Sequence, residues 1–159
     1  MRTHSPFLNN FQQVLHQVYF SPGDACLGAI LSLVNAAQHS LKICVFTISD
    51  DRISEAILTA HREGVRVQLI TDNDKLFDTG SDIRQLAAAG IEVRVDFTSN
   101  HMHHKFAIAD TQAVLTGSYN WTRSAARFNH ENVLVTNHRA TVFAYLNEFE
   151  KLWPEMERL

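Results

Sequence analysis

Apolar runs of strand length alternate with helical segments through residues 14–97, and this alternation constrains the fold more than any other feature of the sequence. Residues 41–48 (LKICVFTI) form a mostly apolar, β-branched-rich run, as expected of a strand that is covered on both faces. Strands that alternate with helices over short connections indicate βαβ crossovers. The sequence therefore predicts an α/β fold with a mixed, mostly parallel β-sheet flanked by helices, in a single domain over residues 1–159.

Periodicity and turn residues give the expected elements. Strands are predicted at residues 14–20, 41–48, 65–71, 91–97, 102–109, 113–117 and 132–136. Helices are predicted at residues 27–37, from Asp50 or Asp51 to Gly64, at 82–89 and at 139–153, with a short helix or loop at 121–127 and with Asp24 as a possible cap of the first helix. Residues 1–12 are polar and aperiodic, so we expect a flexible or partner-packed arm there.

Composition excludes several classes of protein. No apolar run approaches the roughly 20 residues that a membrane-spanning helix needs, and the N-terminus lacks the pattern of a signal or transit peptide. We therefore expect a soluble, cytoplasmic protein. The net charge of -3 does not fit a broad basic surface, so an anionic substrate must be bound locally. Cys26 and Cys44 fall inside regular elements and are predicted to be reduced, buried thiols.

In residues 100–131, a histidine, a lysine, a serine and several amides are interspersed with apolar residues. In a strand, residues two apart share a face, so His103 and Lys105 are predicted to point the same way. A tight hairpin with its tip at residues 111–112 would place Ser118 opposite Lys105 and Asn120 opposite His103. The sequence thus predicts four polar side chains on one patch.

These side chains suggest a phosphate site. A lysine, a hydroxyl and an amide around a histidine can bind phosphoryl oxygens, and the histidine is then placed to attack phosphorus. Glu131 or Asp110 would hold the imidazole in the required tautomer. Each of these residues alone is more often a solvated or structural polar group, and only their joint pattern indicates a phosphate site.

Two other kinds of site are weaker interpretations. His101, His103 and His104 crowd together as zinc ligands would. However, a strand turns His104 away from the other two, and Lys105 would place a positive charge beside the metal, so we predict no metal site. A serine-type triad is also disfavoured, because Ser118 lacks the G-x-S-x-G elbow.

The joint pattern is recognisable as a family signature. It resembles the HKD motif of the phospholipase D superfamily, with a trailing N-x-E element: His103-x-Lys105-x4-Asp110-x6-Gly117-Ser118-x-Asn120, then Asn129-x-Glu131. The strings MHHKFAIAD, TGSYNWT and HENVLV are similar to the Zucchini/mitochondrial phospholipase D branch, which is close to the small bacterial Nuc-type endonucleases. The resemblance implies a phospholipase D-like half with one HKD motif in each chain.

The resemblance also implies how the site works. The family needs two HKD motifs for one active site, so a single-motif chain implies a homodimer. His103 of one protomer resembles the nucleophile that forms a phosphohistidine, and the partner's His103 resembles the acid and base. The resemblance further implies that Lys105, Ser118 and Asn120 bind the phosphate and that Glu131 orients the imidazole. It also implies a place for Asp110 in the catalytic set, although a structural role for Asp110 is favoured. No metal or other cofactor is required.

Four further residues lie within or just after the motif. Arg123 and Arg127, four apart, are candidates for contacts to flanking phosphates in a groove, and a solvated helix face accounts for them equally well. Tyr119 is a candidate for stacking on a base, whereas Trp121 is assigned to the core.

The leading functional hypothesis is a metal-independent endonuclease that acts on single-stranded DNA or RNA through a phosphohistidine. The mitochondrial branch carries a membrane anchor and Zucchini proteins carry a zinc-binding insertion, and their absence here favours a soluble, bacterial-type relative. One alternative is a phospholipase acting on an anionic phospholipid such as cardiolipin, which predicts an apolar surface near the site that the sequence does not display. Another is a non-catalytic nucleic-acid-binding module, against which His103, Lys105 and Glu131 argue.

Overall fold

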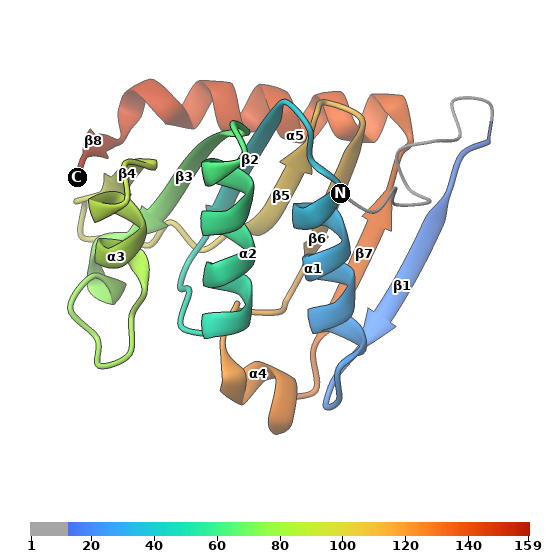
Figure 1. Ribbon diagram of the computed structural model, residues 1–159, viewed down its shortest axis with the longest axis horizontal. Coiled ribbons are helices and arrows are strands. Elements are labelled where there is room, and N and C mark those ends of the chain that lie inside the picture. The colour runs from blue at the N-terminus through green and yellow to red at the C-terminus, as the bar shows by residue number, and fades with distance from the viewer. Residues whose placement is uncertain (1–12) are drawn as a thin grey trace.

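The computed structural model describes residues 13–159, so the arm expected at residues 1–12 lies outside the described residues. Within the described part of the chain, eight strands form one sheet in the order β1-β7-β6-β5-β2-β3-β4-β8 (Figure 1). The strands are β1 His16–Phe20, β2 Ser40–Val45, β3 Arg66–Asp72, β4 Glu92–Asp96, β5 Lys105–Ala109, β6 Ala113–Gly117, β7 Asn132–Thr136 and β8 Glu157–Arg158.

Helices cover both faces of this sheet (Figure 1). They are α1 Ala25–Ala36, α2 Asp51–Arg62, α3 Ile83–Ala88, α4 Arg123–Arg127 and α5 Arg139–Leu152, with short 3-10 turns η1 Asn73–Lys75 and η2 Trp153–Glu155. The larger apolar core lies under α1, α2 and α3, whereas α5 buries Val142 and Phe149 against a smaller cluster on the other face. The predicted α/β class with flanking helices is therefore confirmed.

The prediction of a mostly parallel sheet is wrong. Among the described residues only β2 with β3 and β3 with β4 pair in parallel, and the other five strand pairs are antiparallel. The reason is connectivity. A parallel pair needs a crossover, and α2 and α3 supply the two crossovers between neighbouring strands, whereas β5 follows β4 without a helix and β6 returns from β5 through a short hairpin.

The residues at the helix ends show which predicted caps form. Asp50 begins α2, with its carboxylate accepting from the Arg52 backbone N–H at 3.1 Å, and so decides between the two predicted caps. Asp24 precedes α1 without a side-chain cap, so its predicted capping role is wrong. Gly64 follows α2 with φ +90°, a conformation that glycine adopts without steric cost.

Candidate active site

The predicted site residues gather mostly at one end of the sheet, which we call the active edge: it is the end at which β1, β2, β3, β4 and β6 finish and β5 and β7 begin. Strand pairing fixes this arrangement, because Val45 at the end of β2 lies opposite Lys105 at the start of β5. Gly117 at the end of β6 similarly lies opposite Val133 near the start of β7. Loops at strand ends therefore carry the site while the sheet holds their spacing.

His103 and Lys105 form the centre of the site. The Lys105 Nζ lies 3.1 Å from Nδ1 of His103 and donates to the His103 carbonyl oxygen at 2.7 Å. Lys105 is 8% exposed, whereas His103 is exposed to solvent. The strand starts at Lys105 rather than at residue 102, so His103 belongs to the segment that precedes the strand. The predicted proximity of the two side chains is confirmed, although a common strand face is not its cause.

The charges around His103 favour its neutral form. Burial lowers the pKa of His103, and the positive charge of Lys105 lowers that pKa further. An ammonium offers only donors, so Nδ1 of the neutral ring accepts from Lys105 and the ring proton lies on Nε2. Burial also lowers the pKa of Lys105, against the nearby negative charge of Glu131, which raises it. A neutral imidazole beside a cation is a suitable pair for attack on an anionic phosphodiester.

Phe46 is a site residue that the sequence interpretation missed. Its ring centroid lies 4.6 Å from that of His103 and 5.6 Å from that of His101. The ammonium groups of Lys75 and Lys105 lie 5.3 and 5.6 Å from the same centroid. Phe46 directly follows β2, and within an apolar run it was indistinguishable from a core residue. It gives the imidazole a fixed apolar wall.

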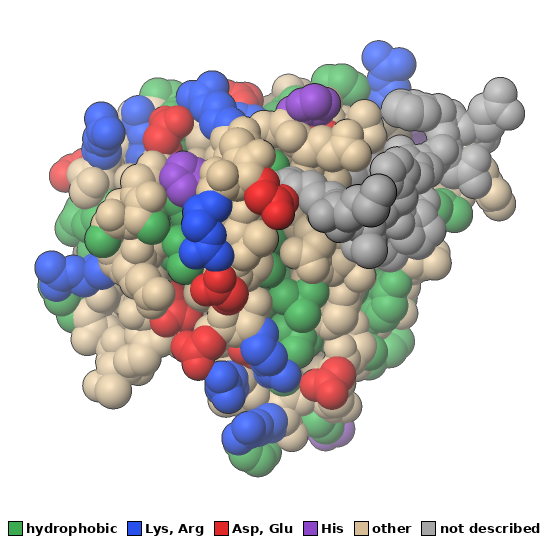
Figure 2. All heavy atoms as spheres, in the orientation of Figure 1, with side chains coloured by type: hydrophobic (Ala, Val, Ile, Leu, Met, Phe, Trp, Pro, Cys, Tyr) green, Lys and Arg blue, Asp and Glu red, His purple; other side chains and the backbone are tan. Residues whose placement is uncertain are grey.

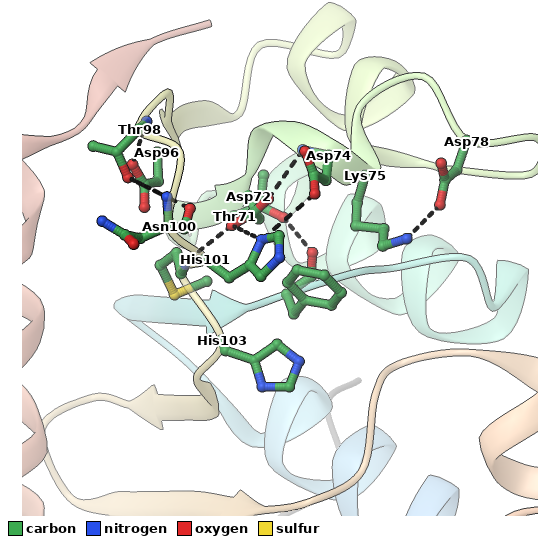
Figure 3. Close-up of polar contacts among 12 residues, drawn as sticks. Thr71, Asp72, Asp74, Lys75, Asp78, Asp96, Thr98, Asn100, His101 and His103 are labelled. Atoms are coloured by element: carbon green, nitrogen blue, oxygen red, sulfur yellow. Dashed lines mark hydrogen bonds and ion pairs between the residues drawn. The ribbon is translucent and has the colours of Figure 1, made fainter.

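A buried carboxylate fixes the segment before His103 (Figure 3). Asp72, fully buried at the end of β3, accepts from the backbone N–H groups of Met102 at 2.7 Å and Asp74 at 3.0 Å. Nδ1 of His101 lies 3.5 Å from a carboxylate oxygen of each aspartate. Figure 3 shows His101 directed toward both carboxylates and the ring of His103 apart from them. The ring of His101 is thus directed toward the two aspartates, with its centroid 6.5 Å from that of His103.

Asp72, Asp74 and His101 also form a candidate metal site. Among the described residues, they are the group whose potential ligand atoms lie close enough to hold a metal ion, within 4.8 Å of one another. Exposed acidic groups are common without a metal. Asp72 is already satisfied by two backbone donors, so we assign the group a structural role. The zinc alternative involving His104 is disfavoured in the structure, because His104 packs on Phe106 and lies 3.8 Å from Glu148 of α5.

The predicted hairpin register is wrong by one residue. Ala109, not Asp110, pairs with Ala113, and Asp110 and Thr111 adopt positive φ values of 51° and 55° in a three-residue loop. Phe106 therefore lies opposite Thr116, which puts Gly117 rather than Ser118 at the level of Lys105. The additional loop residue shifts the register, because hairpin register depends on loop length and turn type.

Ser118 and Glu131 form a second polar group beside Lys105. The Ser118 hydroxyl donates to the Glu131 carboxylate and accepts from the Asn132 backbone N–H at 3.1 Å. Asn129 Nδ2 donates to the other Glu131 oxygen at 3.3 Å. Within one chain the hydrogen bonds described for the Glu131 carboxylate therefore run to Ser118 and Asn129 and not to His103. The expected contact between Glu131 and the imidazole is absent from the described residues of a single protomer.

Gly117 and Asn120 shape the rest of this group. A Cβ on Gly117 would lie 2.0 Å from the Asn132 carbonyl oxygen, so only glycine permits β7 to approach here. Asn120 is half-buried, and its Oδ1 is buried with no hydrogen-bond partner among the described residues. Thr122 caps α4, by accepting from the Ala125 N–H at 3.1 Å, so the side chain of Asn120 is not committed to that helix end.

Asp110 lies at the opposite end of β5. Its carboxylate accepts from the backbone N–H groups of Gln38, His39 and Ser40 at 2.7–2.8 Å. At about 3.4 Å per residue, β5 from Lys105 to Ala109 places it roughly 14 Å along the strand from the start of the site. Asp110 therefore ties the β5–β6 hairpin to the start of β2, and it does not hold the imidazole of its own chain.

The remaining candidates lie near or under the active edge. Arg123 at the start of α4 forms a 2.7 Å ion pair with Asp51 at the start of α2, and Arg127 ends α4 exposed to solvent. Tyr119 and Trp121 are both buried. The suggestion that Tyr119 stacks on a base is therefore wrong, because its ring belongs to the core, and the core assignment of Trp121 is confirmed.

Comparison with known proteins gives a family and a fold. Residues 30–153 match the family described as "Cardiolipin synthase, PLD-like domain". A Xenopus tropicalis protein named mitochondrial cardiolipin hydrolase is 48% identical over 134 residues, covering 84% of this chain and 64% of its own. The human protein of that name is 42% identical over 133 residues, covering 84% of this chain and 53% of its own. This chain thus spans between about half and two thirds of the length of these two relatives.

Solved structures agree with this relationship. The structure of Nuc from Salmonella typhimurium, described as a phospholipase D family member, matches with a TM-score of 0.86 at 26% identity, over 92% of this chain and 99% of its own. NucT from Helicobacter pylori matches with a TM-score of 0.85 at 23% identity, over 92% of this chain and 100% of its own. The second likeness is one of fold alone.

Proposed function

We propose that this chain, which belongs to the phospholipase D-like family, is a phosphodiesterase that cleaves its substrate through a phosphohistidine at His103. The observation that carries the proposal is the contact of 3.1 Å between the exposed imidazole and the buried Lys105 ammonium. The cation favours the neutral, nucleophilic ring and lies where it can neutralise a phosphoryl oxygen.

The reaction needs two histidines in different protonation states. The imidazole of His103 attacks phosphorus, the bond from phosphorus to the leaving oxygen breaks, and the partner's His103 donates a proton to that oxygen. The partner's His103 then accepts a proton from water, the resulting hydroxide attacks phosphorus, and the bond from phosphorus to nitrogen breaks. One chain supplies one such histidine, so the proposal requires a homodimer with both copies of His103 at the two-fold axis.

The other motif residues then bind the phosphate. Lys105, Ser118 and Asn120 are proposed to donate to phosphoryl oxygens in the transition state. The Ser118 hydroxyl must first turn from Glu131, which frees that carboxylate. The hydrogen bonds described for Glu131 do not reach His103 of its own chain, so we propose that it orients the imidazole only in the assembled dimer. There it would replace Lys105 as the partner of Nδ1 and accept from Nδ1–H, so that the ring proton moves from Nε2 to Nδ1 and Nε2 is free to attack.

The test compares His103→Ala with His104→Ala. His104 is the adjacent exposed histidine and is directed toward Glu148 of α5, so it controls for loss of an imidazole near the site. We expect wild type and His104→Ala to hydrolyse bis(4-nitrophenyl) phosphate in EDTA, and His103→Ala to lose that activity. Undiminished hydrolysis by His103→Ala would refute the proposal, and substrate binding without turnover by wild type would support the non-catalytic alternative instead.

For the natural substrate we propose an anionic phospholipid. The support is the name shared by the relatives at 42–48% identity, together with exposed phenylalanines around the active edge. The sequence alone displayed no apolar surface near the site, because these residues are dispersed along the chain. Turnover of cardiolipin in vesicles, absent in His103→Ala, is the expected result.

Single-stranded nucleic acid is the second candidate substrate. Its support is the resemblance to small single-motif nucleases and the match to Nuc over nearly the full length of that chain. Arg123 and Arg127 would then contact flanking phosphates. Cleavage of labelled single-stranded DNA or RNA in EDTA, with no lipid turnover, would favour this candidate over the phospholipid.

The expected cytoplasmic location stays a prediction, and within residues 13–159 no helix has the length and apolar character needed to cross a bilayer.

A further inference from the structure

Four phenylalanines that are distant in sequence are exposed along the active edge. Phe20 ends β1 and is 66% exposed, and Phe97 directly follows β4 and is 48% exposed. Phe77, 78% exposed, lies in the loop between η1 and α3, and Phe128, 73% exposed, follows α4. Exposed apolar side chains that gather around one site mark interaction surfaces, whereas those scattered singly are ordinary. We call these four residues the phenylalanine rim.

The rim flanks the catalytic residues on both sides. Three strand spacings separate β1 from β5, and three separate β4 from β5, or about 14 Å in each direction at 4.8 Å per strand. Phe20 and Phe128 lie on one side, where the turn after β1 bonds to α4 through Gly23 N and Ala126 O at 2.8 Å. Phe77 and Phe97 follow neighbouring strands on the other side. A flat surface that touched both sides would therefore cover His103.

Basic side chains accompany the most exposed rings. The Arg84 guanidinium lies 5.3 Å from the ring centroid of Phe77, and Arg127 directly precedes Phe128. Neither arginine forms an ion pair within residues 13–159, whereas Lys75 and Arg123 pair with Asp78 and Asp51. Figure 2 shows basic, acidic and hydrophobic side chains mixed over the lower part of the molecule, around α4 and the start of α2. The two unpaired guanidiniums offer local positive charge beside apolar rings.

We propose that the phenylalanine rim docks the active edge on an anionic lipid bilayer. The rings enter the boundary between headgroups and acyl chains, while Arg84 and Arg127 bind lipid phosphates above them. Apolar rings alone would also suit a protein partner, but the adjoining unpaired arginines fit a surface that is apolar below and anionic above. Docking brings His103 to the level of the phosphodiesters. The inference rests on the proposed phospholipid substrate, because a nucleic acid would not need the bilayer.

The experiment measures vesicle binding separately from catalysis. Binding is measured by co-sedimentation with phosphatidylcholine vesicles that contain cardiolipin and with pure phosphatidylcholine vesicles, in the His103→Ala background so that lipid is not consumed. The test variant adds Phe77→Ser and Phe128→Ser. The matched control adds Phe143→Ser, because Phe143 is also exposed at 41% and has an arginine, Arg139, at 5.5 Å, but belongs to α5 on the other face of the sheet.

The expected result is binding to cardiolipin vesicles that the double variant weakens at least about tenfold and that Phe143→Ser leaves unchanged. Equal loss in the control, or no loss in the double variant, would overturn the docking surface. Light scattering gives a second test of the docking surface. If the double variant is a monomer while the wild type is a dimer, the rings bind a second copy of the chain, and the proposal is overturned.

A soluble substrate separates this inference from the proposed function. The Phe77→Ser and Phe128→Ser changes, in an otherwise wild-type chain, should leave hydrolysis of bis(4-nitrophenyl) phosphate unchanged while lowering turnover of cardiolipin in vesicles. If wild type fails on the soluble diester, the phosphodiesterase proposal fails whatever the vesicle result. If wild type hydrolyses it and both proteins bind vesicles equally, only the docking surface fails.

Discussion

The ammonium nitrogen of Lys105 lies 3.1 Å from Nδ1 of His103, so a buried cation contacts the imidazole that the proposed reaction uses as its nucleophile. The same ammonium donates to the His103 carbonyl oxygen, which fixes the side chain of Lys105 before substrate arrives. A preorganised cation requires little rearrangement when the phosphate binds, and this favours a transition-state role over a structural one.

Replacement of Lys105 by methionine tests this role. We expect kcat to fall by about 10²–10³-fold, as for loss of one transition-state donor. The positive charge of Lys105 lowers the pKa of His103, so its removal raises that pKa. A larger fraction of the imidazole is then protonated at low pH, and the acidic limb of the profile of kcat/KM against pH should move to higher pH. A folded variant with an unshifted profile would contradict the electrostatic coupling.

Phe46 is predicted to position the His103 ring rather than to stabilise the fold. Phe46→Leu keeps an apolar side chain but removes the aromatic wall 4.6 Å from the imidazole centroid, so kcat should fall about tenfold. Phe46→Tyr retains the ring and should restore most of the activity. Thermal unfolding checks that both variants are equally stable, and equal activity of the two would show that the ring is not needed.

Asp110 is predicted to act on stability alone. Asp110→Ala removes three hydrogen bonds to backbone N–H groups before β2 and should lower the free energy of unfolding by about 2–4 kcal/mol. Asp110→Asn should lose less, because asparagine tolerates the positive φ of 51° and retains one acceptor. Urea unfolding measures the loss. Activity per folded molecule should be unchanged, and a selective loss of kcat in Asp110→Asn would return Asp110 to the catalytic set.

Gly117 is predicted to be irreplaceable for packing. A Cβ there meets the backbone of Asn132, so Gly117→Ala must push β7 from β6 and should destabilise the protein by about 2–4 kcal/mol. Gly28→Ala is the matched control, since it lies within α1 with no atom within 4 Å of the added Cβ, and alanine there should be neutral or stabilising by up to about 1 kcal/mol. Similar melting temperatures for the two variants would contradict the close approach.

The pattern of apolar residues predicted most elements within a few residues, because each strand or helix is decided by its own periodicity and turns. The parallel character of the sheet was overestimated, since residues after 97 lack crossover helices and the pairing partner of β1 is the distant β7. The HKD spacing placed His103 and Lys105 correctly as neighbours, because two residues of extended chain cannot separate far.

Contacts between distant segments could not be predicted from a local pattern of residues. The Asp110 carboxylate bonds to residues about 70 positions earlier, and Phe46 reaches His103 only because β2 pairs with β5. The shift in hairpin register arose because the loop has three residues, 110–112, where a two-residue turn was predicted.

The sequence by itself thus determined the order of strands and helices and the set of chemically capable residues, since both depend on neighbours along the chain. Only the tertiary structure decided that Glu131 bonds Ser118, that Asp110 is part of the scaffold, and that four phenylalanines share one edge with His103. The physical reason is that strand order and register bring together groups from distant segments, and the hydrophobic effect and backbone hydrogen bonds that set the order act on the whole sheet at once.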